Sequence, residues 1–192
     1  MIGSCRSLRG RIQQLVGTAA IAVCAFTSFA SAQTATAPTL KAAFLYNFAK
    51  FTEWSADALA PGEPLVLCVI NDRAVGEMLA DLTKGRSIDG HTLVVSTMKP
   101  DSAALATCRL LYTSGLDAAR SATLLESVAG TPVLTVSDLD KFAERGGVAQ
   151  LIVDKGTMGF SVNLDAMRRA RIVLSSKLLS LARIVKDEPN VR

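Results

Sequence analysis

Side chains suited to catalysis are scarce in this sequence. It holds a single histidine, His91, and a Ser-His-Asp triad or a Cys-His pair would have to use it. No serine lies in a G-x-S-x-G motif, and the nucleotide-binding patterns G-x-x-x-x-G-K-S/T and G-x-G-x-x-G are absent. One histidine also leaves too few ligands for a catalytic zinc site. The sequence therefore predicts no catalytic residue, no metal site and no cofactor, and a hydrolase that uses His91 is kept as a remote alternative.

Two carboxylates stand where a ligand could bind. Asp72 ends the first predicted strand and Asp138 follows the fourth, and open α/β sheets bind ligands at the carboxyl ends of their strands. Aspartate is also common at the start of helices, where it accepts hydrogen bonds from free backbone N–H groups, and this role explains both residues more simply. A periplasmic receptor for a small ligand is therefore an alternative function, with Asn71, Asp72 and Ser137 as its binding residues.

The amino-terminal residues have the three parts of a secretory signal peptide. Arg6, Arg9 and Arg11 form a positive head, an apolar stretch follows over residues 15–29, and Ala30-Ser31-Ala32 fits the small-x-small pattern of a signal peptidase site. The apolar stretch is shorter than the ~20 residues that span a bilayer, which argues against an uncleaved anchor. We expect cleavage after Ala32, export to the periplasm and a single mature domain over residues 33–192.

The charge of the mature chain argues against one class of partner. The whole chain carries a net charge of +4, and removal of a leader (residues 1–32) with three arginines and no acidic residue leaves +1. A nearly neutral protein lacks the positive surface that nucleic-acid binders need.

Two of the four cysteines, Cys68 and Cys108, remain after cleavage. Two cysteines in an exported chain predict one disulfide in an oxidising compartment. Two buried free thiols, or a redox-active pair, are the alternatives. The chain has no C-x-x-C motif to lower the pKa of a thiol, so a structural bridge is the better interpretation.

The pattern of apolar residues predicts the elements that position these side chains. Strands are expected over residues 65–70, 92–97, 110–113, 133–136, 149–153 and 158–162. Helices are expected over residues 40–51, 74–82, 117–128 and 138–144, after Asn163, and over 174–185, where leucines recur at helical spacing. Strands and helices alternate first, and a β-pair with C-terminal helices comes last. This order predicts an α/β fold, a three-layer α/β/α sandwich whose mostly parallel sheet has an antiparallel edge.

Two segments contain side chains that packing of the domain alone does not explain. The first contains Tyr46, Asn47, Lys50 and Trp54, and Trp54 is the only tryptophan. Aromatic side chains with a polar atom suit contact surfaces, because they bury a large area at small entropic cost; the alternative is that they cover the sheet of their own domain. The second segment is Ser175-Ser176-Lys177, whose polar residues interrupt a leucine-rich stretch. These seven residues are the predicted partner-binding side chains.

At these segments the sequence resembles the YfiR family of periplasmic proteins. The resemblance spans nearly the whole predicted mature chain and combines an aromatic motif, a cysteine pair and C-terminal motifs. The matching residues are Tyr46-Asn47-Phe48-x-Lys50-Phe51-x-x-Trp54, Cys68 with Cys108, Gly146-Gly147, Phe160-x-x-Asn163 and Ser175-Ser176-Lys177-Leu178-Leu179-x-Leu181-Ala182. The chain lacks a second cysteine pair known in the family, and Ser161 stands where many relatives have an acidic residue.

The resemblance implies a function that composition does not. It implies a non-catalytic repressor that binds the periplasmic sensor part of an inner-membrane diguanylate cyclase and holds it inactive. Loss of such a repressor raises cyclic di-GMP and favours biofilm growth. The resemblance also implies that Cys68 and Cys108 form a stabilising disulfide, that an outer-membrane lipoprotein can sequester the protein, and that the protein forms a homodimer. A membrane sensor kinase is the alternative partner.

Overall fold

The computed structural model describes residues 37–154 and 157–188. The predicted signal peptide, its cleavage site after Ala32 and the centre of the turn between the last two predicted strands lie outside the described residues. Within the described part of the chain, no helix is both long enough and apolar enough to cross a bilayer.

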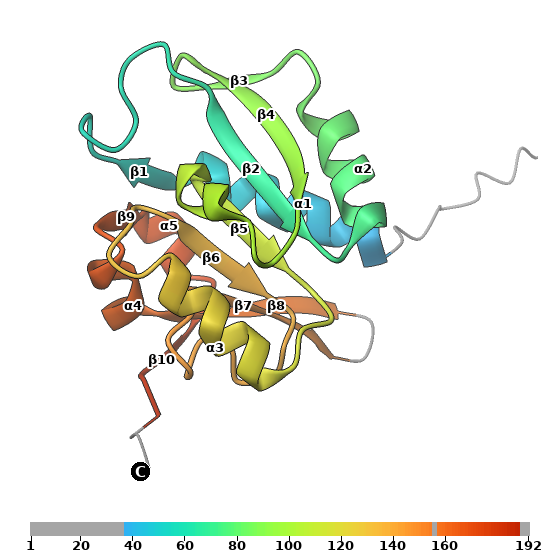
Figure 1. Ribbon diagram of the computed structural model, residues 1–192, viewed down its shortest axis with the longest axis vertical. Helices are drawn as coiled ribbons and strands as arrows, with labels where there is room; N and C mark the ends of the chain where they lie inside the picture. Colours follow the sequence, from blue (N-terminus) through green and yellow to red (C-terminus); the bar gives the residue numbers. More distant parts are fainter. Residues whose placement is uncertain (1–36, 155–156, 189–192) are drawn as a thin grey trace, which may run out of the picture. The chain divides into compact units, whose positions relative to one another are not determined.

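The described residues form an eight-stranded sheet with the order β10-β8-β7-β6-β5-β2-β4-β3 (Figure 1). Its strands are β2 (Leu65–Ile70), β3 (Ser87–Ile88), β4 (His91–Met98), β5 (Leu110–Thr113), β6 (Leu134–Ser137), β7 (Ala149–Asp154), β8 (Thr157–Asn163) and β10 (Arg183–Val185). The β3–β4 and β7–β8 pairs are antiparallel, and the other neighbouring pairs are parallel. The mostly parallel sheet confirms the predicted fold class.

Helices cover both faces of this sheet, and side chains of each strand alternate between two cores. Leu67 and Val69 of β2 point into the core shared with α1 (Ala37–Lys50) and α2 (Arg73–Thr83). Cys68 and Ile70 point into the opposite core, under the 3-10 helix η1 (Ala103–Thr107) and α3 (Ala118–Ser127). Because strand residues alternate in direction, an unbroken apolar run such as 65–70 serves a strand with both faces buried.

The predicted final helix over residues 174–185 is wrong. This stretch instead contains the end of strand β9 (Ile172–Leu174), a one-turn helix α5 (Ser176–Leu179) and strand β10. Leu174 pairs with Thr52 and Val185 with Asn163, so two of the residues in the helical pattern lie in strands. Leu178 alone of the pattern is buried on α5, whereas Leu181 is 75% exposed. β-Branched residues on both sides of α5 favour the strands.

The short helix predicted over residues 138–144 is also wrong, since the structure has successive turns there. Lys141 has a φ of 58°, a left-handed conformation that interrupts a right-handed helix. Phe142 is fully buried, and its ring lies against Gly147, so that a Cβ at position 147 would overlap the ring. Gly146, with a φ of 99°, completes the turn. The paired glycines therefore fit a tight turn around an aromatic ring.

The predicted disulfide is confirmed. Cys68 in β2 is bonded to Cys108, the residue that ends η1 and comes just before β5. Both cysteines are fully buried, and the bridge ties two neighbouring strands on the α3 side of the sheet.

Polar contacts hold the carboxyl-terminal segment on the domain. The Arg169 guanidinium binds the Asp187 carboxylate through two hydrogen bonds of 2.7 and 3.1 Å. The buried Asn163 amide donates a third, 2.7 Å long, to Asp187 and another to the backbone oxygen of Ala143. The side-chain oxygen of Asn163 also caps helix α4 (Leu164–Arg169). Asn163 therefore joins β8, α4 and the chain end at one point.

Candidate functional site

The two sequence segments predicted to bind a partner lie next to each other in the structure. Strand β1 (Thr52–Trp54) pairs with β9 as a small antiparallel ribbon, in the register Thr52↔Leu174 and Trp54↔Ile172 (Figure 1). The Ser175 N–H extends the pairing by donating to the Phe51 oxygen at 2.9 Å. Residues from the start and the end of the domain therefore build one surface element.

Side chains alternate between the two faces of this ribbon, as in any strand pair. Thr52, Ile172 and Leu174 point inward and are buried. Glu53 and Val173 face each other on the outer side, where Glu53 is exposed and Val173 is 55% exposed. The ribbon thus presents an apolar residue and a carboxylate to solvent.

The aromatic residues predicted to bind a partner pack mainly against their own domain. Tyr46 and Trp54 are partly buried against the core. The Trp54 indole N–H donates to the Pro132 oxygen at 3.0 Å, and the Arg86 guanidinium lies 5.6 Å from the centre of the Tyr46 ring. The hydrogen bond satisfies the polar atom of Trp54, and both rings contact their own domain, which reduces the area they offer to another molecule.

The polar residues of the same segments are the ones left at the surface. Asn47, Lys50, Ser176 and Lys177 are exposed. Ser175 is only partly exposed, and its hydroxyl is engaged within the domain. This hydroxyl accepts a hydrogen bond from Leu178 N–H at 3.3 Å and caps α5. We call seven exposed residues in or next to the two segments the ribbon surface; they are Asn47, Lys50, Glu53, Arg171, Val173, Ser176 and Lys177.

A second group of polar side chains meets at the carboxyl ends of β2, β5 and β6. The Lys41 ammonium lies 2.6 Å from Asp138 Oδ2 and 3.3 Å from Asp72 Oδ2. The Tyr112 hydroxyl contacts both carboxylates, at 3.2 Å for Asp138 and 3.3 Å for Asp72. Ser114 donates to Asp138 at 2.9 Å. We call these five residues the switch-point cluster, because the chain order of the strands reverses between β2 and β5, where open α/β sheets bind ligands.

Charge and burial explain the protonation states in the switch-point cluster. Burial disfavours the Lys41 ammonium, but its hydrogen bonds to Asp138 and Tyr112 outweigh that effect and raise the pKa of Lys41 above its ordinary value. Burial also raises the pKa of the Tyr112 phenol, which therefore stays a neutral hydrogen-bond donor. The single ammonium lies beside both carboxylates and offsets one of their two negative charges, and its contacts hold α1 on the sheet.

The structure gives the residues of the predicted ligand site three different environments. Asp72 belongs to the switch-point cluster and also caps α2, accepting from Val75 N–H at 3.2 Å. Ser137 is buried, donating to the Thr113 oxygen at 2.8 Å and accepting from Leu139 N–H. Asn71 is exposed and has a φ of 58°.

Lys41 was not recognised from the sequence as part of a site, although the sequence contains a signal. Lys41, Leu45 and Phe48 are spaced by four and three residues, which puts them on one helix face. Leu45 and Phe48 are fully buried, so the lysine shares the buried face and needs a partner there.

Neither His91 nor any other described residue suggests a metal centre. His91 Nδ1 lies 2.8 Å from the Glu63 backbone oxygen, a contact that holds the loop before β2 against β4. In the described part of the chain, no three His, Cys, Asp or Glu side chains are grouped as metal ligands.

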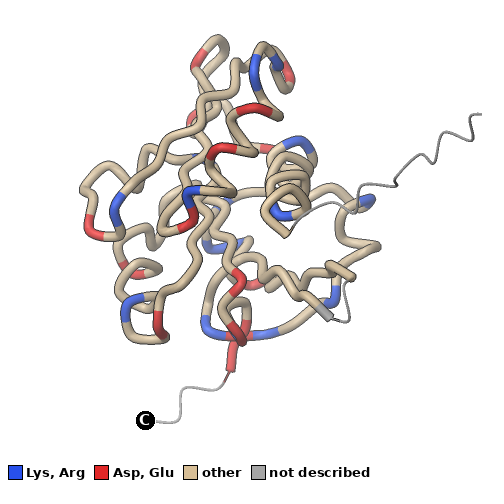
Figure 2. The backbone as a smooth tube through the Cα atoms, turned by 90° about the vertical axis from the view of Figure 1, so that its right-hand side faces the viewer, with Lys and Arg blue, Asp and Glu red and all other residues tan. Residues whose placement is uncertain are grey.

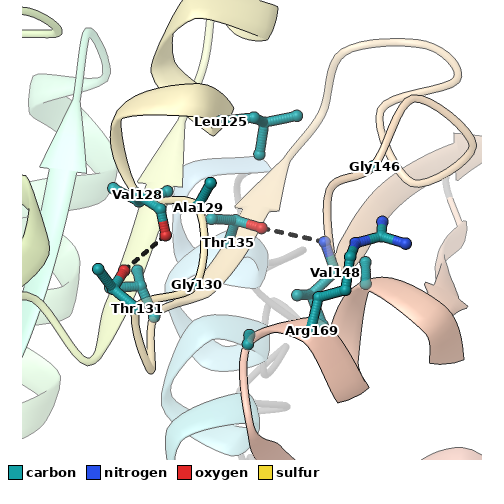
Figure 3. Close-up of a pocket in the computed structure, with 12 residues that line it drawn as sticks. Leu125, Val128, Ala129, Gly130, Thr131, Thr135, Gly146, Val148 and Arg169 are labelled. Atoms are coloured by element: carbon teal, nitrogen blue, oxygen red, sulfur yellow. Dashed lines mark hydrogen bonds between the residues drawn. The ribbon is translucent and has the colours of Figure 1, made fainter.

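A small pocket lies between α3, β6 and α4 (Figure 3). Its polar groups already have partners. The Thr131 hydroxyl donates to the Val128 oxygen at 2.6 Å, and the Val148 N–H donates to Thr135 Oγ1 at 3.0 Å. Arg169, which also lines the pocket, is paired with Asp187. These polar contacts therefore serve the fold.

Comparison with known families identifies the chain. The YfiR/HmsC-like family matches residues 38–183, which include the ribbon and the switch-point cluster. This chain is a member of the YfiR/HmsC-like family. The resemblance stated from the sequence motifs is thereby confirmed. In this YfiR/HmsC-like protein, the β1–β9 ribbon joins the aromatic segment and the serine-lysine segment identified in the sequence.

More distant comparisons add little to this YfiR/HmsC-like assignment. No curated protein matches the chain. Among solved structures, a conserved domain protein from Vibrio cholerae matches with a TM-score of 0.45 and 15% identity, over 64% of this chain and 55% of its own. The ABC domain in complex with L-Trp from Streptococcus pneumoniae matches with a TM-score of 0.45 and 12% identity, over 68% and 57%. The chain thus spans little more than half of each.

Proposed function

We propose that the protein is exported and acts as a non-catalytic regulator of a membrane signalling enzyme. It binds the periplasmic sensor part of an inner-membrane diguanylate cyclase through the ribbon surface and holds the cyclase inactive. An outer-membrane lipoprotein that binds the regulator would release the cyclase.

The pairing of β1 with β9 is the observation that carries this proposal. Two motifs that are far apart in the sequence place exposed polar side chains, Asn47 and Lys50 from one and Ser176 and Lys177 from the other, beside one ribbon. Exposed polar side chains from two distant segments are thereby available together for contact with another protein.

Repression requires a difference in affinity between two states of the partner. A regulator that bound the active and inactive cyclase equally would shift nothing, however tight the binding. To move the cyclase from mostly active to mostly inactive, the regulator must prefer the inactive state by roughly 5 kcal/mol. A domain braced by a buried disulfide and the Lys41 contacts suits this role, because a preformed surface loses little entropy on binding.

Deletion of the gene tests the proposal. We expect cellular cyclic di-GMP and surface-attached growth to rise, and a plasmid copy of the whole gene to restore both. An unchanged cyclic di-GMP level in the deletion strain would count against the proposed function.

A copy that lacks residues 2–32 provides the control for compartment. Without its leader the protein stays in the cytosol, where it cannot meet a periplasmic sensor part, so this copy should fail to restore repression. Restoration by the leaderless copy would contradict the proposed location.

A small-ligand receptor is the second candidate, with Asn71, Asp72 and Ser137 at its site. The Lys41 ammonium between the Asp72 and Asp138 carboxylates weakens this candidate, because a ligand at the sheet edge would have to displace it.

A further inference from the structure

The ribbon surface has more basic than acidic side chains. Residues 50–54 and 171–177 contain three basic residues, Lys50, Arg171 and Lys177, and one acidic residue, Glu53. The same twelve positions therefore carry more positive charge than the whole predicted mature chain, which has a net charge of +1. All three basic side chains are exposed.

Six basic residues elsewhere in the described part of the chain have an acidic partner. Lys41, Arg73, Arg120, Lys141, Arg168 and Arg169 each form an ion pair. Among the described residues, neither Lys50 nor Lys177 forms one, and Arg171 donates to the backbone oxygen of Gly130 instead. Basic and acidic residues are interspersed along the described chain (Figure 2).

The exposed apolar residue of the ribbon, Val173, lies between Arg171 and Lys177 in the sequence. Val173 is the outward residue at the centre of β9 and is 55% exposed. Arg171 comes directly before β9, and Lys177 lies in the first turn of α5 directly after it. Lys50 lies one residue from the Phe51–Ser175 hydrogen bond that closes the ribbon. An apolar centre with a charged rim is the usual anatomy of a protein-binding patch.

We infer that the ribbon surface binds an acidic segment of the regulated protein, with an apolar side chain of that segment on Val173 and its carboxylates facing Lys50, Arg171 and Lys177. This inference rests on the proposed function and specifies the chemistry of the partner. Opposite charges around an interface raise the association rate and exclude partners of the wrong sign.

A protein segment fits this surface better than an anionic membrane. Recognition of acidic lipids typically uses clusters of four to eight Lys or Arg residues, whereas this surface has three basic residues. One exposed valine with a few charged residues near it is better suited to binding a short protein segment than to binding a membrane surface.

Photo-crosslinking in living cells tests the inference. Val173 is replaced by the photoreactive amino acid p-benzoylphenylalanine in the full-length protein, and the crosslinked peptide is identified by mass spectrometry. Val153, in β7, is the matched control because it is also a strand valine and is 58% exposed. We expect a crosslink from position 173 to a peptide rich in Asp and Glu, and none to that peptide from position 153.

Each other result overturns the inference. These results are a crosslinked peptide that is neutral or basic, a phospholipid adduct, or no crosslink from position 173 in protein whose disulfide is intact on a non-reducing gel. The deletion experiment tests the proposed function, whereas the crosslink tests only where the partner binds. A rise in cyclic di-GMP on deletion without a crosslink at 173 would leave the proposed function standing and remove only the ribbon surface as the binding site.

Charge reversal provides a second test on the same crosslink. The double substitution Lys50→Glu with Lys177→Glu should lower the yield from position 173 at least about tenfold, since like charges would then face each other. The control is Lys84→Glu with Lys99→Glu, which changes two exposed lysines outside the ribbon and should leave the yield unchanged. Equal yields from both pairs would contradict an acidic partner.

Discussion

The Lys41 ammonium lies 2.6 Å from the Asp138 carboxylate, 97 residues further along the chain. This contact joins the first helix of the domain to the end of β6, and Asp72 adds a second carboxylate from the end of β2. Because the Lys41 and Asp138 side chains are only 15% and 23% exposed, water cannot replace either partner fully. The contact therefore fixes α1, which carries part of the ribbon surface, in one position on the sheet.

Replacement of Lys41 by Met should destabilise the domain. It leaves Asp72 and Asp138 close together and poorly solvated without their cation, and we expect a loss of about 2–3 kcal/mol in the free energy of unfolding. Urea unfolding of the purified mature protein measures the loss. The control Lys84→Met removes an exposed ammonium and should cost less than about 0.5 kcal/mol. Equal stability of the two variants would show that the buried contact contributes nothing.

Stability at low pH should depend on Asp187. Its hydrogen bonds from Arg169 lower the pKa of the Asp187 carboxyl below its ordinary value. A lowered pKa in the folded state gives stability that is present above the unfolded pKa of about 3.9 and is lost as pH falls through the folded pKa.

The variant Asp187→Asn should therefore be less stable than the wild type by about 1 kcal/mol at pH 7, a small value because the ion pair is partly solvated. The gap should close as the pH falls below 4, as measured by urea unfolding at a series of pH values. Asp81→Asn, at an exposed position in α2, should show little gap at any pH. A gap for Asp187→Asn that is the same at pH 2 and pH 7 would contradict this account.

Substitution by alanine should be tolerated at Gly159 but not at Gly147. In Gly147→Ala the new Cβ overlaps the buried Phe142 ring, which must shift, and we expect a loss of about 2 kcal/mol or more. Gly159→Ala is the matched control, because no atom lies within 4 Å of the added Cβ and its effect should stay within about 0.5 kcal/mol. Thermal unfolding of both variants measures the difference, and similar melting temperatures would refute the role given to Gly147.

Removal of the disulfide should cost stability and spare the ribbon surface. The bridge closes a loop with a sequence separation of 40, so the double variant Cys68→Ala with Cys108→Ala should lose about 4 kcal/mol on the chain-entropy account. The bridge lies in the core under α3, whereas β9 and α5 pack into the other core. At temperatures where the variant is folded, the crosslink from position 173 should therefore persist, and its loss in folded protein would show that the two cores are coupled.

The sequence predicts the regular part of the fold well, and the reasons are local. Strands β2 and β5 have the expected limits, 65–70 and 110–113. The apolar run of β2 begins after Pro64 and ends before Asn71, and β5 lies between the polar residues Arg109 and Ser114. Asn163 caps a helix as expected, since the capping interaction lies within the next three residues. These features depend on neighbours in the chain, which a sequence displays directly.

The unexpected features depend on residues that are distant in the chain. Leucines 174, 178 and 181 have helical spacing, yet pairing with β1 draws Leu174 into a strand. Lys41 gains its role from carboxylates on two loops of the sheet. The sequence identifies both ribbon segments by their residue types, but only the strand register brings them together.

The β1–β9 pairing also sets when the ribbon surface can exist. One strand lies near the start of the domain and the other near its end, so a chain still emerging amino terminus first has only half of the surface. Formation of contacts between such distant residues comes with global folding. A partner that needed both halves of this surface would therefore bind a complete, folded molecule and leave a truncated or partly folded one unbound.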